Sequence, residues 1–431
     1  SVARMPSATT LPLLMADTLP LRQASDLPKY RVESAARYLP WVFGRATVNP
    51  VPLDTIGQDW LVADHPILGV DRVTVAGTET SGWQLQQRVD ETGHGISVVR
   101  LSQPTTKETV VVTVAGRKHP TTGALLETPG PIVREIMRLC KHVEDVGAWE
   151  GLDTNYGQVE LGFVIDSVQT LRVTLASVIE PLNAVWRPGW AAPKAPADPV
   201  ATLTVMNTES ITARTDTTTL GTTLRVSYAK DWAAGAARGA IRLGAPDAQE
   251  RWGELGQTLD LPTVRRARDA LAFATTRLQN VGRASWIVEA TVDARIGSVR
   301  AGQTVLLAHP HVPAGLALVT AVSNDREQST LKITASMHTE SPPRIELLRM
   351  NSAVDAAATA APMVNYRDGV ATITVSDAQG NPLANAAVTL DGLYTANTDS
   401  SGRVQFKTPR GLHTLSVSTP GFATFEIDVV V

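Results

Sequence analysis

Short β-branched segments separated by glycine-containing turns recur along most of this sequence. Val70–Val75 alternates apolar and polar residues and runs into a turn that contains Gly77. Trp83–Val89 and Ile96–Leu101 repeat the pattern on either side of a second turn, and Glu108–Val114 follows as another β-branched run. Successive short strands joined by glycine turns are typical of antiparallel sheets and small barrels. This part of the chain is therefore predicted to be an antiparallel sheet or barrel.

Two segments have the 3.6-residue period of an amphipathic helix. The first has Pro131 in its first turn, where proline is tolerated, and is predicted to end at Gly147. The second covers Leu261–Val281, and Gly282 after it is expected to adopt the left-handed conformation that ends many helices. The apolar faces consist of Ile132, Ile136, Leu139, Cys140 and Val143 in the first helix, and of Val264, Ala267, Leu271, Ala274, Leu278 and Val281 in the second.

The other segments with a regular pattern are predicted to be strands. Phe163–Ile179 returns to a strand pattern after the first helix, and Ala201–Val205 and Thr222–Tyr228 are strands separated by a Thr-rich stretch. After the second helix, turns with glycine and proline separate four further strands, which indicates a small antiparallel barrel. These four are Ser285–Asp293, Thr304–Ala308, Leu316–Ser323 and Thr330–Ser336.

The changes of pattern divide the 431 residues into five parts. Residues 1–30 are an extended, proline-spaced arm, which either docks on another surface or lies on its own domain. Residues 31–193 and 200–345 are two β-rich domains, separated by the linker Ala191–Pro199. Residues 346–365 are a linker, irregular or with a short helix over Asn351–Pro362, and residues 366–431 are an independent β domain. The predicted fold class is mainly β and multidomain, with small barrels, two helices and a C-terminal β-sandwich.

Charge and cysteine content exclude several classes of function. The formal net charge is −3, which argues against non-specific nucleic-acid binding, because such binding needs a basic face. Cys140 is the one cysteine, so an intrachain disulfide, a cysteine-type zinc site and an iron–sulfur cluster are excluded. No stretch approaches the roughly 18–20 apolar residues that a membrane-spanning helix needs.

The sequence contains few patterns that carry catalysis. It has no HExxH pair, no GxSxG elbow, no P-loop and no GxGxxG after a strand. His309 and His311 provide too few ligands for a closed metal site. Asp64 and His65 resemble half of a catalytic relay, but no nucleophile can be identified for them. We therefore predict no catalytic residue, no metal site and no cofactor.

A run of acidic residues around the first helix keeps an enzymatic alternative open. A glycosidase needs two carboxylates that face each other, one of them held neutral by burial. The spacing selects no such pair, and a solvated helix face is the favoured interpretation. The alternative function is a cell-wall or capsule hydrolase, with Glu135 and Glu144 as the carboxylates to test. The run consists of Glu127, Glu135, Glu144, Asp145 and Glu150.

Tryptophan is unusually frequent, with nine residues against six tyrosines and six phenylalanines. Tryptophan is favoured in cores and at interfaces because it combines a large apolar area with one hydrogen-bond donor. Trp186 and Trp190 could stack on a sugar, but packing is the favoured interpretation.

The C-terminal residues 366–431 contain two Asp-x-x-Gly turns, at Asp377–Gly380 and Asp399–Gly402. Their carboxylates are expected to cap local amides while glycine takes the positive φ. Strand alternation places Val375, Val388, Leu390, Val404, Phe406, Leu415 and Val417 inward. The segment resembles the carboxypeptidase-regulatory-like (transthyretin-like) β-sandwich family. That resemblance implies a spacer, adhesion or sugar-contacting module without catalysis, and a plain immunoglobulin-like spacer is the alternative.

Motifs over about residues 30–345 resemble the baseplate hub, or central tail-tip, proteins of long non-contractile-tailed bacteriophages. The motifs are Tyr38–Arg45, Trp60–Ile67, Trp286–Val292, Val299–Leu307 and Gly315–Val322. The resemblance implies a virion protein of the tail tip, assembled in the host cytoplasm as a homotrimer whose repeated tube-like β domains build a pseudo-sixfold ring under the tail tube. The implied partners are the tape-measure protein, a distal tail protein, tail fibres and, for the C-terminal domain, a host-surface glycan.

Two departures from the hub pattern are visible. The single cysteine excludes the iron–sulfur-bearing variant of tail-tip protein. The chain is also short for a full hub, so we expect an N-terminal part to be missing or supplied by another subunit. A secreted adhesin is a third alternative, which the lack of a signal-peptide pattern disfavours.

Overall fold

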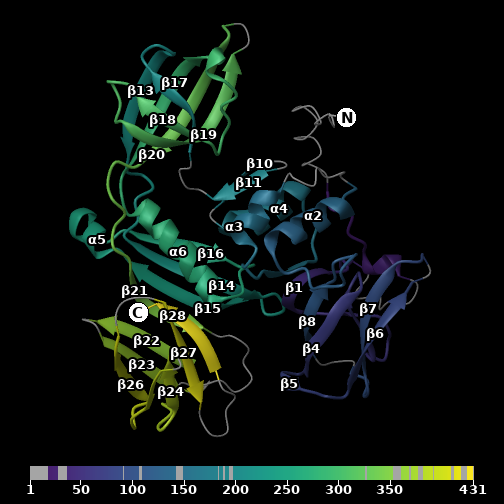
Figure 1. Cartoon of the computed structure of the whole chain (residues 1–431). Helices are drawn as coiled ribbons and strands as arrows, with labels where there is room; N and C mark the ends of the chain where they lie inside the picture. Colours follow the sequence, from purple (N-terminus) through teal and green to yellow (C-terminus); the bar gives the residue numbers. More distant parts are fainter. Residues whose placement is uncertain are drawn as a thin grey trace.

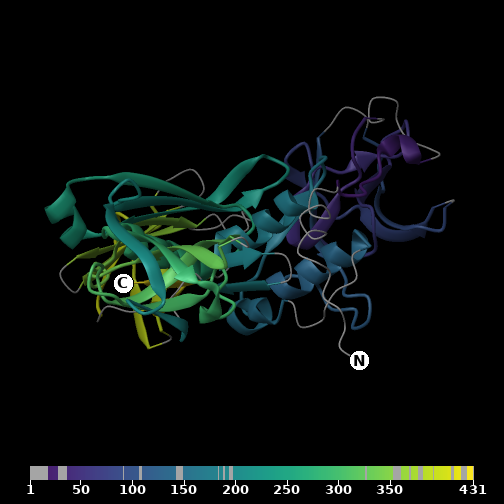
Figure 2. The same cartoon turned by 90° about the horizontal axis from the view of Figure 1, so that it is seen from above.

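The computed structural model describes residues 18–27, 36–90, 92–105, 109–141, 149–182, 184–187, 190–193, 198–325, 328–352, 361–367, 370–376, 382–391, 393–408, 412–418 and 425–430. Helices α2, α3 and α4 lie between the N-terminal strands and the rest of the molecule, with a curled sheet and the C-terminal strands at opposite ends (Figure 1). The view from above again places the N-terminal strands apart from these two parts (Figure 2). The fold is mainly β, as predicted.

Strand β1 (Trp41–Val48) organises the N-terminal half. Its first four residues pair with β9 (Gly162–Ile165) and its last four pair with β8 (Val110–Arg117), both antiparallel. The change of partner occurs at Gly44, which has a φ of 60°. A Cβ at this position would lie 1.8 Å from the carbonyl oxygen of Leu161, so the crossing requires glycine. The sheet continues through β4 (Ile67–Val75) and β5 (Thr78–Glu79), in the order β5-β4-β8-β1-β9.

A second sheet, of order β2-β3-β7-β6, shares a core with the first. Its strands are β2 (Val51–Pro52), β3 (Asp59–Ala63), β6 (Trp83–Val89) and β7 (Gly95–Leu101). The shared cluster includes Val42 and Val112 from one sheet and Val62 and Val99 from the other. The four strands predicted between residues 70 and 114 match β4, β6, β7 and β8, which confirms the predicted antiparallel pairing.

The first predicted helix ends earlier than its pattern suggests. Helix α2 is Pro129–Leu139, and Cys140 is its C-cap. Lys141 then has a φ of 59°, the left-handed conformation that stops a helix. The predicted end at Gly147 lies outside the described residues. A further helix, α3 (Glu150–Tyr156), is absent from the sequence prediction.

The prediction of strand for Phe163–Ile179 is wrong beyond residue 165, where β9 ends. Helix α4 (Leu171–Ile179) follows, and the Thr170 hydroxyl caps it by accepting a hydrogen bond from the amide three residues later, at 3.3 Å. Its many β-branched residues favour strand locally, but their burial follows helical spacing. The buried face consists of Leu171, Thr174, Leu175, Val178 and Ile179.

A hairpin occupies the start of the predicted linker. Strands β10 (Ala184–Arg187) and β11 (Trp190–Pro193) pair antiparallel, after the short turn η3 (Glu180–Leu182). The linker prediction for Ala191–Pro199 is therefore wrong at both of its ends, because β11 includes residues 191–193 and the next strand begins at Pro199.

Six strands form the curled sheet, which has its own core (Figure 1). The order is β12-β18-β19-β20-β17-β13, and β12 pairs with β18 in parallel, while the other pairs are antiparallel. The four strands predicted after the second helix are present and pair antiparallel with one another. The sheet as a whole is not antiparallel, because β12 joins it in parallel. The Thr-rich stretch, predicted to separate two strands, contains a strand of its own, β13. The strands are β12 (Pro199–Thr204), β13 (Thr208–Asp216), β17 (Ser285–Asp293), β18 (Thr304–Ala308), β19 (Gly315–Asp325) and β20 (Thr330–Met337), with the short turn η4 (Ala294–Ile296) after β17.

Helix α6 (Ala267–Val281) backs a four-stranded sheet, of which three strands come between β13 and β17 in sequence and the fourth follows β20. The order is β16-β14-β15-β21, and α5 (Pro246–Trp252) connects β15 to β16. The predicted start of α6 at Leu261 is wrong because that residue ends β16. The strands are β14 (Thr223–Asp231), β15 (Ala236–Gly244), β16 (Gly256–Leu261) and β21 (Glu346–Ser352).

Gly282 ends α6 for a different reason from the predicted one. Its φ is −76°, so it is not left-handed. A Cβ there would lie 2.8 Å from the carbonyl oxygen of Leu278 and 2.8 Å from Pro343 Cγ. Close approach to the Leu278 carbonyl and to Pro343, rather than a positive φ, requires the glycine.

One large buried cluster joins the helices, β1, β9 and the α6-backed sheet. Trp41 and Phe43 of β1 belong to it together with Leu224 of β14 and Leu271 of α6. The cluster therefore contains residues from both of the β-rich parts predicted at 31–193 and 200–345, whose boundaries stay a prediction.

The region predicted as a linker, residues 346–365, contains two strands. β21 pairs antiparallel with β15, and β22 (Ala361–Arg367) pairs with β23 (Val370–Ser376) of the C-terminal part. The expectation of a linker or short helix is wrong for residues 346–352 and 361–365, because long-range pairing overrides their weak local pattern, and residues 353–360 lie outside the described residues.

The C-terminal part contains two sheets, β22-β23-β26 and β25-β24-β27-β28. The seven residues predicted to point inward are all buried, between 0% and 7% exposed. The Asp399 carboxylate accepts hydrogen bonds from the amides of Ser401 and Arg403, and Gly402 has a φ of 71°, as predicted. The turn predicted at Asp377–Gly380 lies outside the described residues. The remaining strands are β24 (Ala387–Leu390), β25 (Tyr394–Asn397), β26 (Arg403–Lys407), β27 (Leu412–Ser418) and β28 (Phe425–Val430).

The described part of the N-terminal arm, residues 18–27, lies on its own chain. The Leu19 amide donates to the carbonyl of Gln169 at 3.0 Å, and the Ala24 amide donates to that of Arg37 at 2.8 Å. Leu19, Ala24 and Leu27 are buried, the last two in or beside the short turn η1 (Ala24–Asp26). Of the two alternatives for the arm, docking on its own domain holds for this segment. Within the described ranges, no helix is long and apolar enough to cross a membrane.

Candidate functional site

Asp64 and His65 are adjacent in sequence but have separate structural roles. His65 is buried, and its Nε2 accepts a hydrogen bond from the Val42 amide at 2.9 Å. Its Nδ1 lies 3.1 Å from the carbonyl oxygen of Pro66, to which it donates because Nε2 is already an acceptor. Burial lowers the pKa of His65 to about 3. Both ring nitrogens bind the backbone, so this histidine has no free nitrogen for a relay.

The buried neutral His65 predicts a specific dependence of stability on pH. Because its pKa is lower in the folded chain than in the unfolded chain, protonation favours unfolding, and stability falls as pH drops below about 6.5. The expected loss from this residue is up to about 1.4 kcal/mol per pH unit until the pH approaches its folded value. Urea unfolding between pH 7 and 4 measures it. A His65→Gln variant with the same pH slope as the parent would refute this assignment.

Asp64 instead anchors the N-terminal segment through Arg22. The Arg22 Nε lies 3.0 and 3.1 Å from the two Asp64 carboxylate oxygens, and the same guanidinium pairs with Asp90. Burial raises the pKa of Asp64 despite this partner. Burial opposes ionisation of Asp90 as well, but bonds from Arg22, Thr92 and His94 lower its pKa well below its ordinary value. These ion pairs hold the N-terminal segment at Arg22 against Asp64 and against Asp90 in the β6–β7 turn.

Glu135, one of the two carboxylates of the hydrolase alternative, is buried between two arginines. Its Oε1 lies 2.6 Å from Arg117 Nε, and its Oε2 lies 2.7 Å from Arg138 Nε. Burial favours protonation, but the two guanidinium groups outweigh it and lower the pKa of Glu135 below its ordinary value. A glycosidase acid needs a raised pKa, so Glu135 lacks the property that this role requires.

Of the other acidic residues of the run, the structure describes the side chain of Glu127. Glu127 lies 3.9 Å from Arg265, and burial, with Glu160 adding to it, raises its pKa. Glu144 and Asp145 lie outside the described residues, as does the side chain of Glu150. The hydrolase pair of the alternative, Glu135 and Glu144, therefore stays a prediction, because Glu144 lies outside the described residues.

The remaining candidates from the sequence are two histidines, the single cysteine and two tryptophans. The His309 and His311 rings are tilted by 49° with their centroids 5.3 Å apart, and the His309 Nδ1 accepts a hydrogen bond from the His311 amide. Among the residues with described positions, no three His, Cys, Asp or Glu side chains gather as a metal site. Cys140 is half-buried at the end of α2. The side chains of Trp186 and Trp190 lie outside the described set, so the sugar-stacking alternative stays a prediction.

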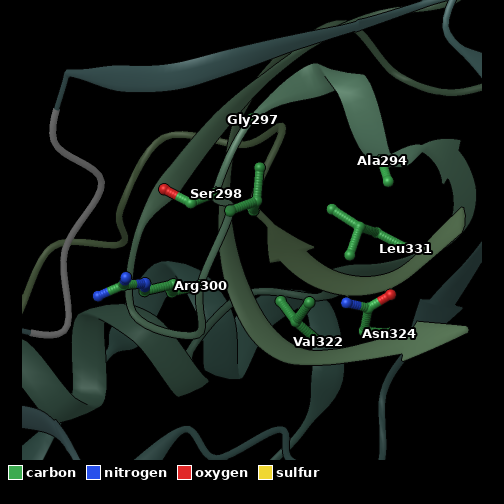
Figure 3. Close-up of a pocket in the computed structure, with 8 residues that line it drawn as sticks. Ala294, Gly297, Ser298, Arg300, Val322, Asn324 and Leu331 are labelled. Carbon is green, nitrogen blue, oxygen red and sulfur yellow. The ribbon is translucent and has the colours of Figure 1, made fainter. Parts of the chain in front are cut away.

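A cavity of about 450 Å³ opens at one end of the curled sheet. Ser298 and Arg300 lie on one side of it, and Leu331, Val322 and Asn324 lie on the other (Figure 3). Its lining contains one charged side chain, that of Arg300, and no acid–base pair. The cavity could accept an apolar group, but its lining contains no carboxylate, histidine or lysine that could act as a base for the Ser298 hydroxyl.

Several side-chain hydrogen bonds connect β1 and the residues just after it to the tip of the β14–β15 hairpin, and we call this contact the junction. The Arg238 Nη2 donates to the Thr47 hydroxyl at 2.6 Å and pairs with Asp231 at 2.8 Å. The Asn49 side-chain amide donates to the carbonyl of Ala233 at 2.8 Å. The Arg238–Thr47 and Asn49–Ala233 bonds connect residues 191 and 184 positions apart in sequence.

Trp232 seals the same junction. Its ring contacts both the large buried cluster and the core shared by the two N-terminal sheets. Its Nε1 donates to the carbonyl of Gly162 at 3.2 Å, and Lys230 Nζ lies 4.5 Å from its ring centroid. The sequence does not predict this role of Trp232, because the two clusters that its ring contacts consist mainly of residues distant in sequence.

Backbone hydrogen bonds also connect the N-terminal sheet to the α6-backed sheet, between residues 160–162 and residues 263–265. Leu161 and Val264 form an antiparallel bridge, with the Gly162 amide donating to Thr263 at 2.8 Å and the Arg265 amide donating to Glu160 at 3.1 Å. Two sheets that are separate in sequence are therefore held side by side through backbone and side-chain bonds. The junction therefore fixes the two β surfaces relative to each other.

Comparison with known proteins identifies the C-terminal domain. Residues 371–431 match the carboxypeptidase regulatory-like domain, which confirms the resemblance predicted for this part of the chain. No curated protein matches the chain.

Solved structures give the fold of the larger part. A chain in the virion of a native gene transfer agent particle superposes with a TM-score of 0.54 at 16% identity, over 73% of this chain and 87% of that one. A tail protein of Neisseria meningitidis MC58 (TM-score 0.35, 13% identity, 69% and 95% covered) and the 43 kDa tail protein of prophage MuSo2 from Shewanella oneidensis (0.34, 9%, 70% and 98%) also match, with TM-scores too low to establish a shared fold. The chain therefore shares its fold with a virion protein.

Proposed function

We propose that this chain is a structural protein of a phage tail tip. It acts as the baseplate hub, a homotrimer that forms a ring below the tail tube. The observation that carries the proposal is the fold shared with a chain of the gene transfer agent virion over 73% of the present chain. The role requires assembly surfaces and no active site, and it locates the protein in the virion.

The joined pair of sheets supports a ring. A trimer of chains that each hold two sheets side by side presents six sheets around one axis, as the predicted pseudo-sixfold ring requires. The bonds of Arg238, Asn49 and Trp232 fix the two sheets of one chain relative to each other. The tape-measure protein, a distal tail protein and tail fibres are the proposed neighbours. The C-terminal domain is the proposed spacer or contact to a host-surface glycan.

We do not favour the hydrolase. Glu135 is ionised and held between two arginines, and the cavity at the curled sheet has no acid–base pair. The proposed role is therefore structural rather than enzymatic.

The oligomeric state tests the ring. Size-exclusion chromatography with multi-angle light scattering is expected to give a mass near three times 46.0 kDa. An isologous dimer would contradict a threefold hub. If the purified chain is monomeric, addition of the neighbouring tail proteins should produce the trimer, and a chain that stays monomeric in that mixture would also contradict it.

A further inference from the structure

Two apolar side chains project into solvent from the turn between β12 and β13. Met206 is 93% exposed and Val205 is 59% exposed, although residues in turns are usually polar or glycine. We call these two residues the apolar tip. Single scattered apolar residues are normal on a protein surface, whereas the two residues of the apolar tip are consecutive.

The backbone of this turn is held by Asn207. Its side-chain oxygen accepts a hydrogen bond from the Thr204 amide at 2.8 Å, and its side-chain nitrogen donates to the carbonyl of Thr202 at 2.8 Å. The Asn207 carbonyl also accepts a hydrogen bond from the Asp293 amide, at the end of β17, at 3.1 Å. The apolar tip is therefore positioned before anything binds it, and association does not have to order the turn.

The cavity of the curled sheet opens beside the apolar tip. Ala294, which lines the cavity, directly follows Asp293, the residue that is hydrogen-bonded to the turn. Leu331, a core residue of the curled sheet, and Val322 also line it (Figure 3). An apolar cavity of about 150 Å³ is enough for a benzene molecule. The cavity of about 450 Å³ therefore has room for the apolar tip, and methionine adapts well to irregular space.

Opposite charges lie beside the apolar tip and beside the cavity. Glu209 is exposed and three residues from Met206, and Arg300 is exposed where it lines the cavity. Within the described part of the chain, neither of these two side chains has a hydrogen bond or an ion pair. Three residues span at most about 10 Å, so a Met206 side chain in the cavity brings Glu209 close to Arg300.

We infer that the apolar tip of one copy of this chain enters the cavity of a second copy, with Glu209 of the first paired to Arg300 of the second. Apolar surface meets apolar surface and opposite charges meet at its edge, as in specific interfaces. A second copy is favoured over another protein because each chain carries both halves of the contact. The inference rests on the homotrimer of the proposed function and names a contact between its subunits.

The positions of the two halves are compatible with a threefold ring. Each copy in such a ring uses two different surfaces toward its two neighbours, and these surfaces adjoin on the side that faces the axis. The apolar tip and the cavity lie at the same end of the curled sheet, so they can serve as these adjoining surfaces.

Disulfide trapping between two different variants tests the contact. Met206→Cys and Ser298→Cys, the second in the lining of the cavity, are made in separate chains, mixed and oxidised. A bond between the two introduced thiols then has to join two chains. We expect a covalent dimer of about twice 46.0 kDa from the mixture and none from either variant by itself. The unsubstituted chain, oxidised in the same way, controls for bonds made by Cys140.

Val89→Cys mixed with Ser298→Cys is the matched control. Val89 is also an apolar residue with a high exposure, 71%, but it lies at the end of β6 in the N-terminal half. This mixture should give no covalent dimer. A yield equal to that of the Met206→Cys mixture would overturn the inference, because trapping would then reflect random collision.

Charge reversal provides a second readout. Glu209→Arg and Arg300→Glu should each raise the concentration needed for assembly about tenfold, and the two changes in one chain should restore it. Met206→Gln should weaken assembly similarly. Its side chain is exposed in the single chain, so the thermal midpoint of the dissociated protein should stay unchanged, which separates a lost contact from misfolding.

The outcomes distinguish this contact from the proposed function. Trapping is carried out in the assembled state, with the neighbouring tail proteins present if the chain needs them. A trimer that forms no covalent dimer would overturn the contact and leave the hub. Trapping in an assembly with the mass of two chains would support the contact and contradict the threefold ring. A chain that stays monomeric in both conditions would overturn both.

Discussion

Replacing Gly44 by alanine is expected to destabilise the N-terminal half by about 3–5 kcal/mol, in the range of the most damaging single substitutions. Two effects add at this position. The φ of 60° is unfavourable for a residue with a Cβ, and the new Cβ would lie 1.8 Å from the carbonyl oxygen of Leu161. The obstacle is backbone, so relief requires β1 to separate from β9.

Gly77→Ala is the matched control for Gly44→Ala. Gly77 has a φ of 80°, but a Cβ there meets no atom within 4 Å. It should therefore show the cost of the positive φ alone, about 1–2 kcal/mol. Urea unfolding followed by tryptophan fluorescence measures both variants. Equal losses for the two would mean that the close approach to Leu161 does not contribute, and would contradict the crossing described for β1.

Glu135→Gln is expected to cost about 3–5 kcal/mol, because it leaves the buried charge of Arg117 without its carboxylate. The Arg117 side chain is 12% exposed and that of Glu135 is 4% exposed, so water cannot replace the lost partner. Glu254→Gln is the matched control, since its carboxylate pairs with Arg242 at the surface and should change stability by less than about 1 kcal/mol. Similar losses in the two variants would contradict a buried ion pair at Glu135.

The effect of Glu135 should also depend on pH in a defined direction. Its pKa is lower in the folded chain, so its contribution is fully present above the ordinary glutamate pKa of about 4.3 and is lost as pH falls through the folded value. The difference in stability between the parent and Glu135→Gln should therefore shrink on acidification below pH 4. The same variant tests the hydrolase alternative, because turnover on peptidoglycan or capsule that disappears with this change while the protein stays folded would favour an enzyme.

Local patterns predict the strands of this chain well where glycine or proline marks the turns on both sides. Ser285–Asp293 and Thr304–Ala308 match β17 and β18 residue for residue, because glycine or proline turns isolate their apolar runs. The inward residues of the C-terminal sandwich are also predictable, since alternation alone assigns their face.

Elements whose stability comes from distant partners are not predictable in this way. Strand β21 lies in the predicted linker, and its partner β15 is about a hundred residues earlier. Helix α4 is rich in β-branched residues, so its local preference opposes the structure that its buried face imposes. Trp232 joins the two sheets through partners that no local pattern identifies.

The location of the protein in a particle tests the central claim most directly. Tailed particles from the genome that encodes this chain can be labelled with gold-conjugated antibodies against it and viewed by electron microscopy. A tail-tip hub predicts gold at the end of the tail distal to the capsid, with no label on particles that lack the chain. Labelling of the capsid alone, or particles that carry no label while the chain is found free, would contradict the account.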